Sequence, residues 1–582
     1  MKKSKSLSRK LRAGIAIGAL AFAGASTPTV LANQPYYSGG GINHVLVISV
    51  DGMHALDYLN CVSGGYCPNL AALGSDGINY LQSSTSKPSD SFPGLMALMT
   101  GGSPRTMGVN YDVAYDRDLN PPVYTTGNGL PGGPCTAGAT PSGTSTEYDE
   151  GIELDQTMLN GGAPSGDGGI NAINPNFLVR DQNCNPVYPW NFVRDNTIFG
   201  VIHAAGGYTA WSDKHASYSS VGGPTGTTSD SNVNDYYSPE INSDSSYFAT
   251  QAPPQLVIPE CTKSGKPFLP DQLAVSAADD YTGSFQNIKC YDGLKVSAII
   301  NEINGKNHDG TANEPEPNIF GMNFQAVSIG QKLIYQHGAV AAGYSETGGY
   351  ADSIGTPTAS LKNEIEFIDA SIGAMVSALK EQRLLDSTLI IITAKHGQSP
   401  VDSSRYVRDG SNDPATLLSA YLAPSENSAI GPTEDDVALL WLANSTDTPA
   451  AVALLESESP ASDNIAGIGE IFSGPSIGLY YNSGDSRAPD ILITPNIGVT
   501  YSNSKKKLAE HGGFSHDDTN VIMLVSNPSF KASTISTPVE TAQVAPTILQ
   551  ALQLSPNQLQ AVQKEHTPSL PGVSFSSEQY GH

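Results

Sequence analysis

Four polar residues stand where an apolar run ends or where a helix begins. Asp51 and His396 each follow a short apolar run, Ser91 precedes an apolar-periodic stretch, and His511 precedes a Gly-Gly pair. Carboxylates and neutral imidazoles are common zinc ligands, and a hydroxyl at a helix N-terminus lies near the positive end of the helix dipole. Together these residues predict a nucleophile beside a bound cation. Taken singly, each has a plainer explanation, such as a helix N-cap for Ser91.

A second polar group follows in the stretch "AWSDKHAS". Lys214 and His215 could bind anionic oxygens, and Trp211 could stack on a base or an apolar leaving group. We expect these three residues to follow a strand at residues 199–204. A surface turn with a half-buried tryptophan is the alternative interpretation.

Short apolar runs and one long helix must position these side chains. Apolar residues at three- and four-residue spacing predict a helix over 361–379, and "AQVAPTILQALQL" predicts another near Pro546. Strands are predicted at 45–48, 389–392 and 521–528. Strands that alternate with long helices indicate an α/β fold with a mostly parallel central sheet and helices on both faces. In such sheets polar groups that do chemistry gather at the carboxyl ends of the strands.

The first 32 residues have the features of a secretory signal peptide. Six cations between residues 2 and 12 precede an apolar stretch at 13–25, and small residues lead to a break after Ala32. A membrane anchor, the alternative, needs roughly 20 apolar residues, more than this stretch provides. We therefore expect a secreted or periplasmic protein.

The formal net charge is −26, and removing the cationic signal peptide makes it more negative. Such a surface repels nucleic acid backbones and anionic membranes. We expect neither as a partner and instead a small-molecule substrate. An anionic substrate would need local positive charge from a metal, a lysine or a helix N-terminus.

Six cysteines in an exported chain predict three disulfides. The sequence allows 15 pairings, of which the sequential one is the simplest: Cys61–Cys67, Cys135–Cys184 and Cys261–Cys290. Buried free thiols are the alternative. Four of these cysteines lie in Gly-, Ser- and Pro-rich stretches, so we expect loop-rich insertions stapled by disulfides.

The order of these motifs resembles the alkaline phosphatase superfamily, and within it the type I phosphodiesterase/nucleotide pyrophosphatase group. Its members have a metal-binding Asp after the first strand, a Thr or Ser nucleophile before Phe-Pro, an Asp-His-Gly and a late His-Gly. Asp51, Ser91, His396 and His511 match these positions. The resemblance implies that Ser91 attacks phosphorus and forms a covalent phospho-enzyme intermediate beside divalent metal ions, expected to be zinc.

The sequence departs from this pattern at three positions. Lys395 replaces the acid of Asp-His-Gly, and Gly94 replaces the Asn after Phe-Pro. An alignment on Gly355 and Pro357 places Asp352 where the first metal site should have a histidine. We expect metal ligands at Asp51, Ser91, Asp352, His396 and His511. We also expect Lys395 to take over part of one metal's charge, which would leave one firmly bound ion in place of two.

After the signal peptide predicted at 1–32, the resemblance implies one hydrolase domain at 33–582. Its core is expected at about 40–111, 196–215, 319–402 and 486–555, with insertions at about 112–195, 216–318 and 403–485. The function implied is an exported, metal-dependent hydrolase of phosphate diesters or monoesters, with Ser91 and Lys395 as catalytic residues and Trp211, Lys214 and His215 binding substrate. Two alternatives stay open: a sulfatase-like hydrolase, and a catalytically degenerate binding protein on the same scaffold.

Overall fold

The computed structural model describes residues 41–127, 129–148, 170, 173–241, 281–334, 347–410, 412–457, 467–482 and 484–575. Its centre is an eight-stranded sheet with the order β17-β2-β16-β9-β1-β8-β6-β7. Strand β16 runs antiparallel to both of its neighbours, and the other pairs are parallel. The strands are β1 (His44–Val50), β2 (Gly77–Tyr80), β6 (Ala210–Ser212), β7 (Asp235–Tyr237), β8 (Ile319–Phe324), β9 (Thr388–Thr393), β16 (Leu524–Ser526) and β17 (Ser533–Ile535).

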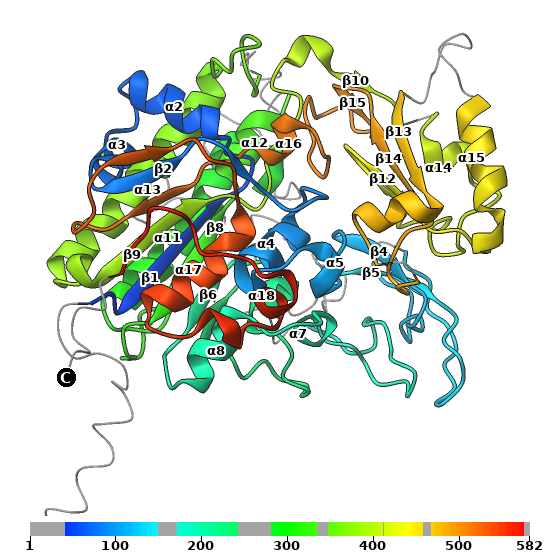
Figure 1. Ribbon diagram of the computed structural model, residues 1–582, viewed down its shortest axis with the longest axis horizontal. Coiled ribbons are helices and arrows are strands. Elements are labelled where there is room, and N and C mark those ends of the chain that lie inside the picture. The colour runs from blue at the N-terminus through cyan, green and yellow to red at the C-terminus, as the bar shows by residue number, and fades with distance from the viewer. Residues whose placement is uncertain are drawn as a thin grey trace, which may run out of the picture.

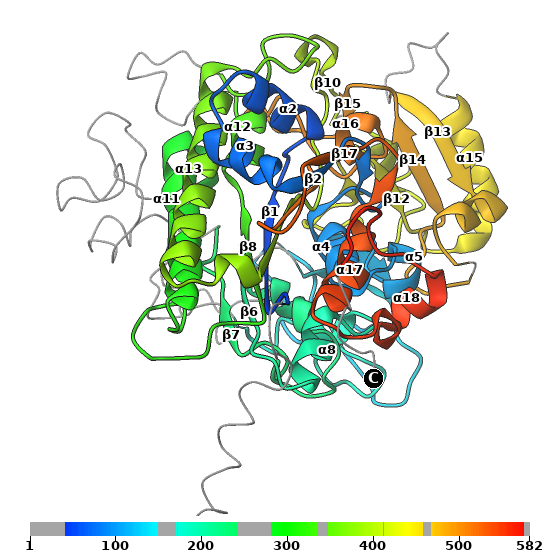
Figure 2. The same ribbon diagram turned by 60° about the vertical axis from the view of Figure 1, so that its left-hand side comes forward.

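Helices cover both faces of this sheet (Figures 1 and 2). Successive side chains of β1 alternate between the faces: Leu46 and Ile48 join one core cluster and Val45 and Val47 join another. The first cluster includes α11 (Phe285–Ile303) and α13 (Ala359–Glu381), and the second includes α4 (Ser91–Thr100) and α17 (Val544–Ala551). The predicted α/β class with a mostly parallel sheet is therefore confirmed.

Shorter elements complete this body. They are α2 (Ala55–Ser63), α3 (Pro68–Ser75), α5 (Pro104–Met107), α7 (Pro189–Phe192), α12 (Ala326–Lys332), α18 (Gln560–Glu565) and the antiparallel pair β4 (Val113–Asp116) and β5 (Thr144–Glu147). None of the helices in the described ranges is long and apolar enough to cross a membrane.

Two local predictions were wrong. Residues 199–204 form helix α8 (Ile198–Ala204) and not a strand, because the Thr197 side chain accepts the N–H of Gly200 and starts a helix. A short apolar run alone does not separate a strand from a buried helix. The segment 216–318 contains the 19-residue helix α11, which packs in the main core and is not part of a loop-rich insertion.

The segment 403–485 contributes to a second, smaller sheet. Its order is β11-β12-β14-β13, formed by β11 (Thr433–Glu434), β12 (Ala438–Leu440), β14 (Ile491–Pro495) and β13 (Ile468–Ser473). Helices α14 (Pro414–Leu417) and α15 (Thr448–Ser457) share its separate core cluster. Figure 1 shows this region, in yellow and orange, beside the main sheet.

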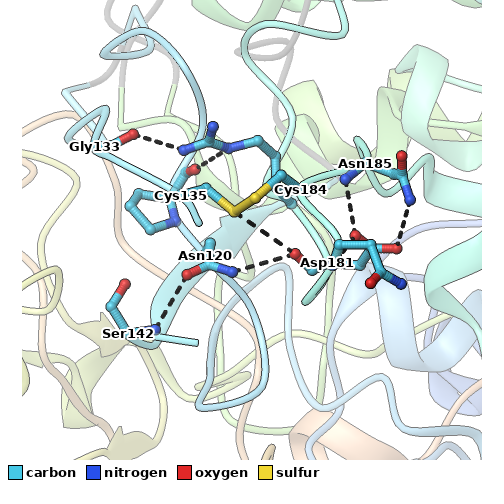
Figure 3. Close-up of a disulfide and its surroundings, with 10 residues drawn as sticks. Asn120, Gly133, Cys135, Ser142, Asp181, Cys184 and Asn185 are labelled. Carbon is cyan, nitrogen blue, oxygen red and sulfur yellow. Dashed lines mark hydrogen bonds between the residues drawn. A yellow bond between two sulfur atoms is a disulfide. The ribbon is translucent and has the colours of Figure 1, made fainter. Parts of the chain in front are cut away.

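The predicted sequential disulfides are present where the structure describes both partners. Cys61 pairs with Cys67, and Cys135 pairs with Cys184. Beside the second bond, the Asp181 carboxylate accepts the backbone N–H of Asn185 at 2.8 Å (Figure 3). Cys290 is also disulfide-bonded, and Cys261, its predicted partner, lies outside the described residues.

Candidate active site

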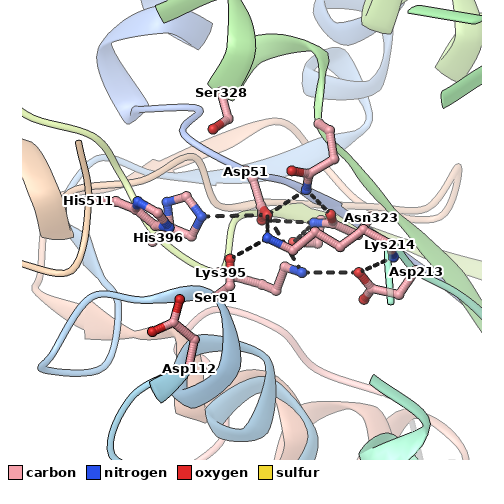
Figure 4. Close-up of polar contacts among 12 residues, drawn as sticks. Asp51, Ser91, Asp112, Asp213, Lys214, Asn323, Ser328, Lys395, His396 and His511 are labelled. Atoms are coloured by element: carbon pink, nitrogen blue, oxygen red, sulfur yellow. Dashed lines mark hydrogen bonds and ion pairs between the residues drawn. The ribbon is translucent and has the colours of Figure 1, made fainter. Parts of the chain in front are cut away.

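Three neighbouring strands of the main sheet deliver polar residues to one place. Asp51 follows β1, His396 follows β9, and Asn323 lies near the end of β8 (Figure 4). Backbone bonds hold the strand ends together: the Asp51 N–H donates to the Phe324 carbonyl at 3.0 Å, and the Gly52 N–H donates to the His396 carbonyl at 3.1 Å. Asp51 and His396, which were selected because each follows a strand, therefore lie close together at the same edge of the sheet.

Asp51 is fully buried and surrounded by hydrogen-bond donors and cations. Burial alone would raise its pKa, but the interactions with Lys395, His396 and Lys214 outweigh burial and hold the pKa well below its ordinary value. The distances to its carboxylate are 2.8 Å from Asn323 Nδ2, 2.6 Å from Gln325 Nε2, 3.5 Å from His396 Nε2, 3.6 Å from Lys395 Nζ and 3.9 Å from Lys214 Nζ.

Ser91 is the first residue of α4 and is fully buried. Asp90 caps this helix, because its side chain accepts the N–H of Phe92 at 3.3 Å. The Ser91 hydroxyl oxygen lies 3.0 Å from Lys214 Nζ, so a lysine ammonium connects Ser91 to Asp51 (Figure 4). Gly94 lets α4 approach β9, since a Cβ there would overlap the Lys395 carbonyl. This contact explains why Gly94 replaces the expected Asn.

Lys395 is fully buried and held by its own partners. Its Nζ lies 3.2 Å from Asp213 Oδ1 and 4.2 Å from the centre of the Tyr218 ring. The other oxygen of Asp213 accepts the Trp211 indole N–H at 3.0 Å. We call Asp51, Asp213, Lys214, Lys395 and His396 the Asp51 half of the site.

His511 lies next to His396, with ring centres 4.0 Å apart. Around it are carboxylates: its Nε2 is 3.5 Å from Asp90 Oδ1, and its Nδ1 is 3.8 Å from Glu510. Ligand-type atoms of Asp435, Glu510 and His511 lie within 4.8 Å of one another. We call Asp90, Asp112, Asp435, Glu510 and His511 the His511 half.

Burial dominates the protonation of the His511 half. Burial, followed by the charges of Lys332 and His396, lowers the pKa of His511 well below its ordinary value, so the imidazole is neutral. Burial and then the neighbouring Asp112 raise the pKa of Asp90 to about 7. Burial and then Glu510 raise the pKa of Asp435 well above its ordinary value.

Three residues predicted for the site have other surroundings. Asp352 is exposed in a turn, where its carboxylate accepts the N–H groups of Ile354 and Thr356, so we remove it from the ligand set. Trp211 is fully buried in the core and leaves no face for a substrate. His215 is also buried, and its Nδ1 lies 2.7 Å from Glu240.

Sequence reasoning missed several residues of the site. Asn323 is the last residue but one of the apolar strand 319–324, and Gln325 directly follows that strand, so the rule applied to Asp51 could have found them. Asp90 and Asp213 directly precede Ser91 and Lys214 in the sequence. Asp435 has no such signal, since it lies in the small-sheet region.

The sequence model of the type I phosphodiesterase/nucleotide pyrophosphatase family matches residues 45–155 and 276–517. The chain belongs to this family and is by class a phosphoric ester hydrolase. A search of curated proteins found no significant match.

One solved structure of low identity shows the same fold, and two with lower TM-scores are similar to the chain over most of its length. Wild-type alkaline phosphatase PafA has 13% identity and a TM-score of 0.51, over 89% of this chain and 97% of that one. An inactive variant of murine ectonucleotide pyrophosphatase/phosphodiesterase 5 in complex with AMP has 15% identity and a TM-score of 0.46, over 88% of this chain and 96% of that one. The human form of this protein has 14% identity and a TM-score of 0.47, over 88% and 95%.

The family is metal-dependent, and the two halves of the site fit a metal ion differently. In the His511 half, His511 Nδ1 and Asp90 Oδ1 are buried and have no hydrogen-bond partner among the described residues, and Asp435 and Glu510 add carboxylates. This donor set suits a divalent ion. In the Asp51 half two ammonium groups already face the two carboxylates of Asp51 and Asp213, and an ion about 4 Å from either ammonium would meet roughly 8 kcal/mol of repulsion from it at an effective dielectric of 20. In the His511 half Lys332 and Lys507 also border Glu510, but they face four acids. The Asp51 half therefore does not fit a divalent ion.

Proposed function

We propose that the protein is an exported hydrolase of small phosphate esters, with diesters as the preferred class, and that Ser91 is its nucleophile. The observation that carries this proposal is the 3.0 Å contact between the Ser91 hydroxyl and Lys214 Nζ at the start of α4. An ammonium donor and a helix N-terminus both favour negative charge on that oxygen. Diester preference is supported by the family match.

In the proposed reaction, Ser91 Oγ forms a bond to phosphorus while the bond from phosphorus to the leaving oxygen breaks. The hydroxyl proton leaves Ser91, and the leaving oxygen takes up a proton. Water then attacks phosphorus, the bond to Ser91 breaks, and the serine regains its proton as the product leaves. Lys214 stabilises the negative charge that develops at Ser91 and at the phosphoryl oxygens.

A divalent ion, for which zinc is the first candidate, would be held by Asp435, Glu510 and His511. When bound, such an ion supplies positive charge that stabilises a phosphoryl transition state. The neutral state of the His511 imidazole supports this role, since a metal ligand must be deprotonated. Of the predicted ligands, Ser91 is kept here as nucleophile only.

Export is supported by the disulfides, because such bonds form in oxidising compartments. The signal peptide predicted at residues 1–32 lies outside the described residues. Mass spectrometry of the mature protein would locate its first residue, which we expect to follow Ala32.

The test is hydrolysis of three chromogenic substrates, a phosphate diester, a phosphate monoester and a sulfate ester, by the wild type and Ser91→Ala. We expect the diester to be hydrolysed and Ser91→Ala to lower kcat/KM by about 10³-fold or more. Ser89→Ala is the matched control, since Ser89 is a buried serine two residues away whose hydroxyl donates to the Asp518 carbonyl. Its activity should stay within a few-fold of the wild type.

Each other outcome rejects part of the proposal. Diester hydrolysis that survives in Ser91→Ala removes the nucleophile. Turnover of the sulfate ester alone favours the sulfatase-like alternative. A wild type inactive on all three esters favours the catalytically degenerate alternative, which the replacement of a metal-ligand carboxylate by Lys395 also motivates.

A further inference from the structure

We propose that Asp51 holds two lysine ammonium groups in place of a divalent ion, and that Lys214 is the cation that serves Ser91. The first part concerns ion binding and is independent of catalysis. The second part rests on the proposed function. Both follow from four features of the Asp51 half: its donors, its charge balance, its rigidity and the position of Lys214.

The donors around Asp51 already engage both carboxylate oxygens. Asn323 donates to Oδ1, and Gln325 donates to Oδ2. Lys395, Lys214 and His396 all lie within 4 Å of Oδ2. An ion at Oδ2 would have to compete with these three side chains for the space around that oxygen and for its remaining acceptor capacity.

The buried charges in this half balance without an ion. The carboxylates of Asp51 and Asp213 face the ammonium groups of Lys214 and Lys395. Adding a divalent ion would leave two positive charges uncompensated where these four side chains meet, and an unpaired buried charge is strongly unfavourable. Within the described residues, the metal-type cluster of three ligating side chains lies elsewhere, at Asp435, Glu510 and His511.

The contacts of the Lys395 side chain hold it in one position. It is fully buried, and Asp213 and the face of the Tyr218 ring hold its Nζ. Asp213 is itself held by the Trp211 indole N–H at 3.0 Å and the Lys214 backbone N–H at 2.8 Å. A side chain fixed by such a network does not move aside for a metal ion. Trp211, predicted to bind substrate, therefore positions this ammonium group.

Lys214 bridges the two reactive groups. Its Nζ lies 3.0 Å from Ser91 Oγ and 3.9 Å from Asp51 Oδ2, and its side chain is 12% exposed. A cation that bridges a nucleophilic oxygen and a carboxylate does the electrostatic work that a metal ion would do there. Because its side chain reaches the surface, Lys214 can also contact a phosphoryl group that enters the site.

The test counts metal ions per chain in the full-length protein, after incubation with zinc and removal of free ions, without substrate. We expect the isosteric variant Asp51→Asn to keep the wild-type count. His511→Ala should lose one ion. The double variant Lys214→Met/Lys395→Asp, which removes both ammonium groups and restores a carboxylate, should gain one.

Two results would overturn the proposal: a wild type with two tightly bound ions, or an Asp51→Asn protein that binds one ion fewer than the wild type. A double variant that melts cooperatively and gains no ion also counts against it. If the double variant does not fold, the comparison of the wild type with Asp51→Asn decides. A wild type and Asp51→Asn that both bind no zinc support the proposal at Asp51 and reject the ion at His511. The count is independent of turnover, so a failed Ser91→Ala test leaves it standing.

Discussion

The two halves of the site lie side by side, and the tilted rings of His396 and His511 meet between them with their centres 4.0 Å apart. Their electrostatics nevertheless differ. In the Asp51 half two carboxylates pair with two ammonium groups, three of the four fully buried. The His511 half gathers four acids near a neutral imidazole, with two lysines, Lys332 and Lys507, paired to Glu510. Burial raises the pKa of two of the acids, Asp90 and Asp435. The side chains of the Asp51 half thus neutralise one another, whereas the His511 half beside it has an excess of acids that can bind an ion.

The largest expected difference between the halves is in stability. Asp51→Ala leaves Lys395 buried near a single remaining carboxylate, so we expect the free energy of unfolding to fall by about 3–5 kcal/mol. Glu510→Ala should cost less, about 1–3 kcal/mol, because neither of its lysine partners is fully buried: Lys507 is 39% exposed and Lys332 is 14% exposed. Urea unfolding followed by tryptophan fluorescence measures both. Equal losses of unfolding free energy in the two variants would contradict the expected difference between the two halves.

The next contrast concerns catalysis and uses one lysine from each side. Lys214→Met removes the cation that touches Ser91, and we expect kcat/KM on a phosphate diester to fall by about 10²-fold or more. Lys332→Met is the counterpart, since Lys332 Nζ lies 3.7 Å from Glu510. Its loss leaves Lys507 beside Glu510, so the decrease should be below about 10-fold. If Lys332→Met lowered kcat/KM more than Lys214→Met does, the lysine that matters for catalysis would lie in the His511 half.

The parallel strands of the fold and the central residues of the site could both be predicted from the sequence, for the same reason. Buried parallel strands are apolar runs, and the residue after such a run lies at the sheet edge where ligands bind. That rule found Asp51 and His396 and would also have found Asn323 and Gln325. The prediction of Asp352 came from the family resemblance and not from this rule. It failed because the alignment rested on a Gly and a Pro that shape an exposed turn.

Other parts could not be predicted from local patterns. The sequence does not show whether the Trp211 side chain faces a ligand or the core. The packing of β6 against α8 determines that it lies in the core. The position of Asp435 depends on how the small-sheet region meets the loop that carries His511. The bridging position of Lys214 depends on distances that join residues 51, 91 and 214, and no spacing in the sequence encodes them.

The smallest contrast is in the pH dependence of stability, measured with a chelator present. The lowered pKa of His511 means that, below its ordinary value of about 6.5, the unfolded chain binds a proton that the folded chain does not. The contribution of His511 to stability should therefore fall as the pH drops below about 6.5, by at most about 1.4 kcal/mol per pH unit. The pKa of Asp51 is lowered too, but as an acid it contributes stability above about 3.9, which is lost only below that pH.

Between pH 6.5 and 4.5 the two residues should thus differ in how their contribution to the free energy of unfolding changes with pH. The difference in unfolding free energy between His511→Gln and the wild type should change steadily with pH, because the variant has no imidazole to protonate in the unfolded state. The difference between Asp51→Asn and the wild type should stay constant, because Asp51 is ionised in both states over this range. A constant difference for His511→Gln and a changing one for Asp51→Asn would mean that the group that titrates over this range lies in the Asp51 half, and the division of the site drawn above would have to be reversed.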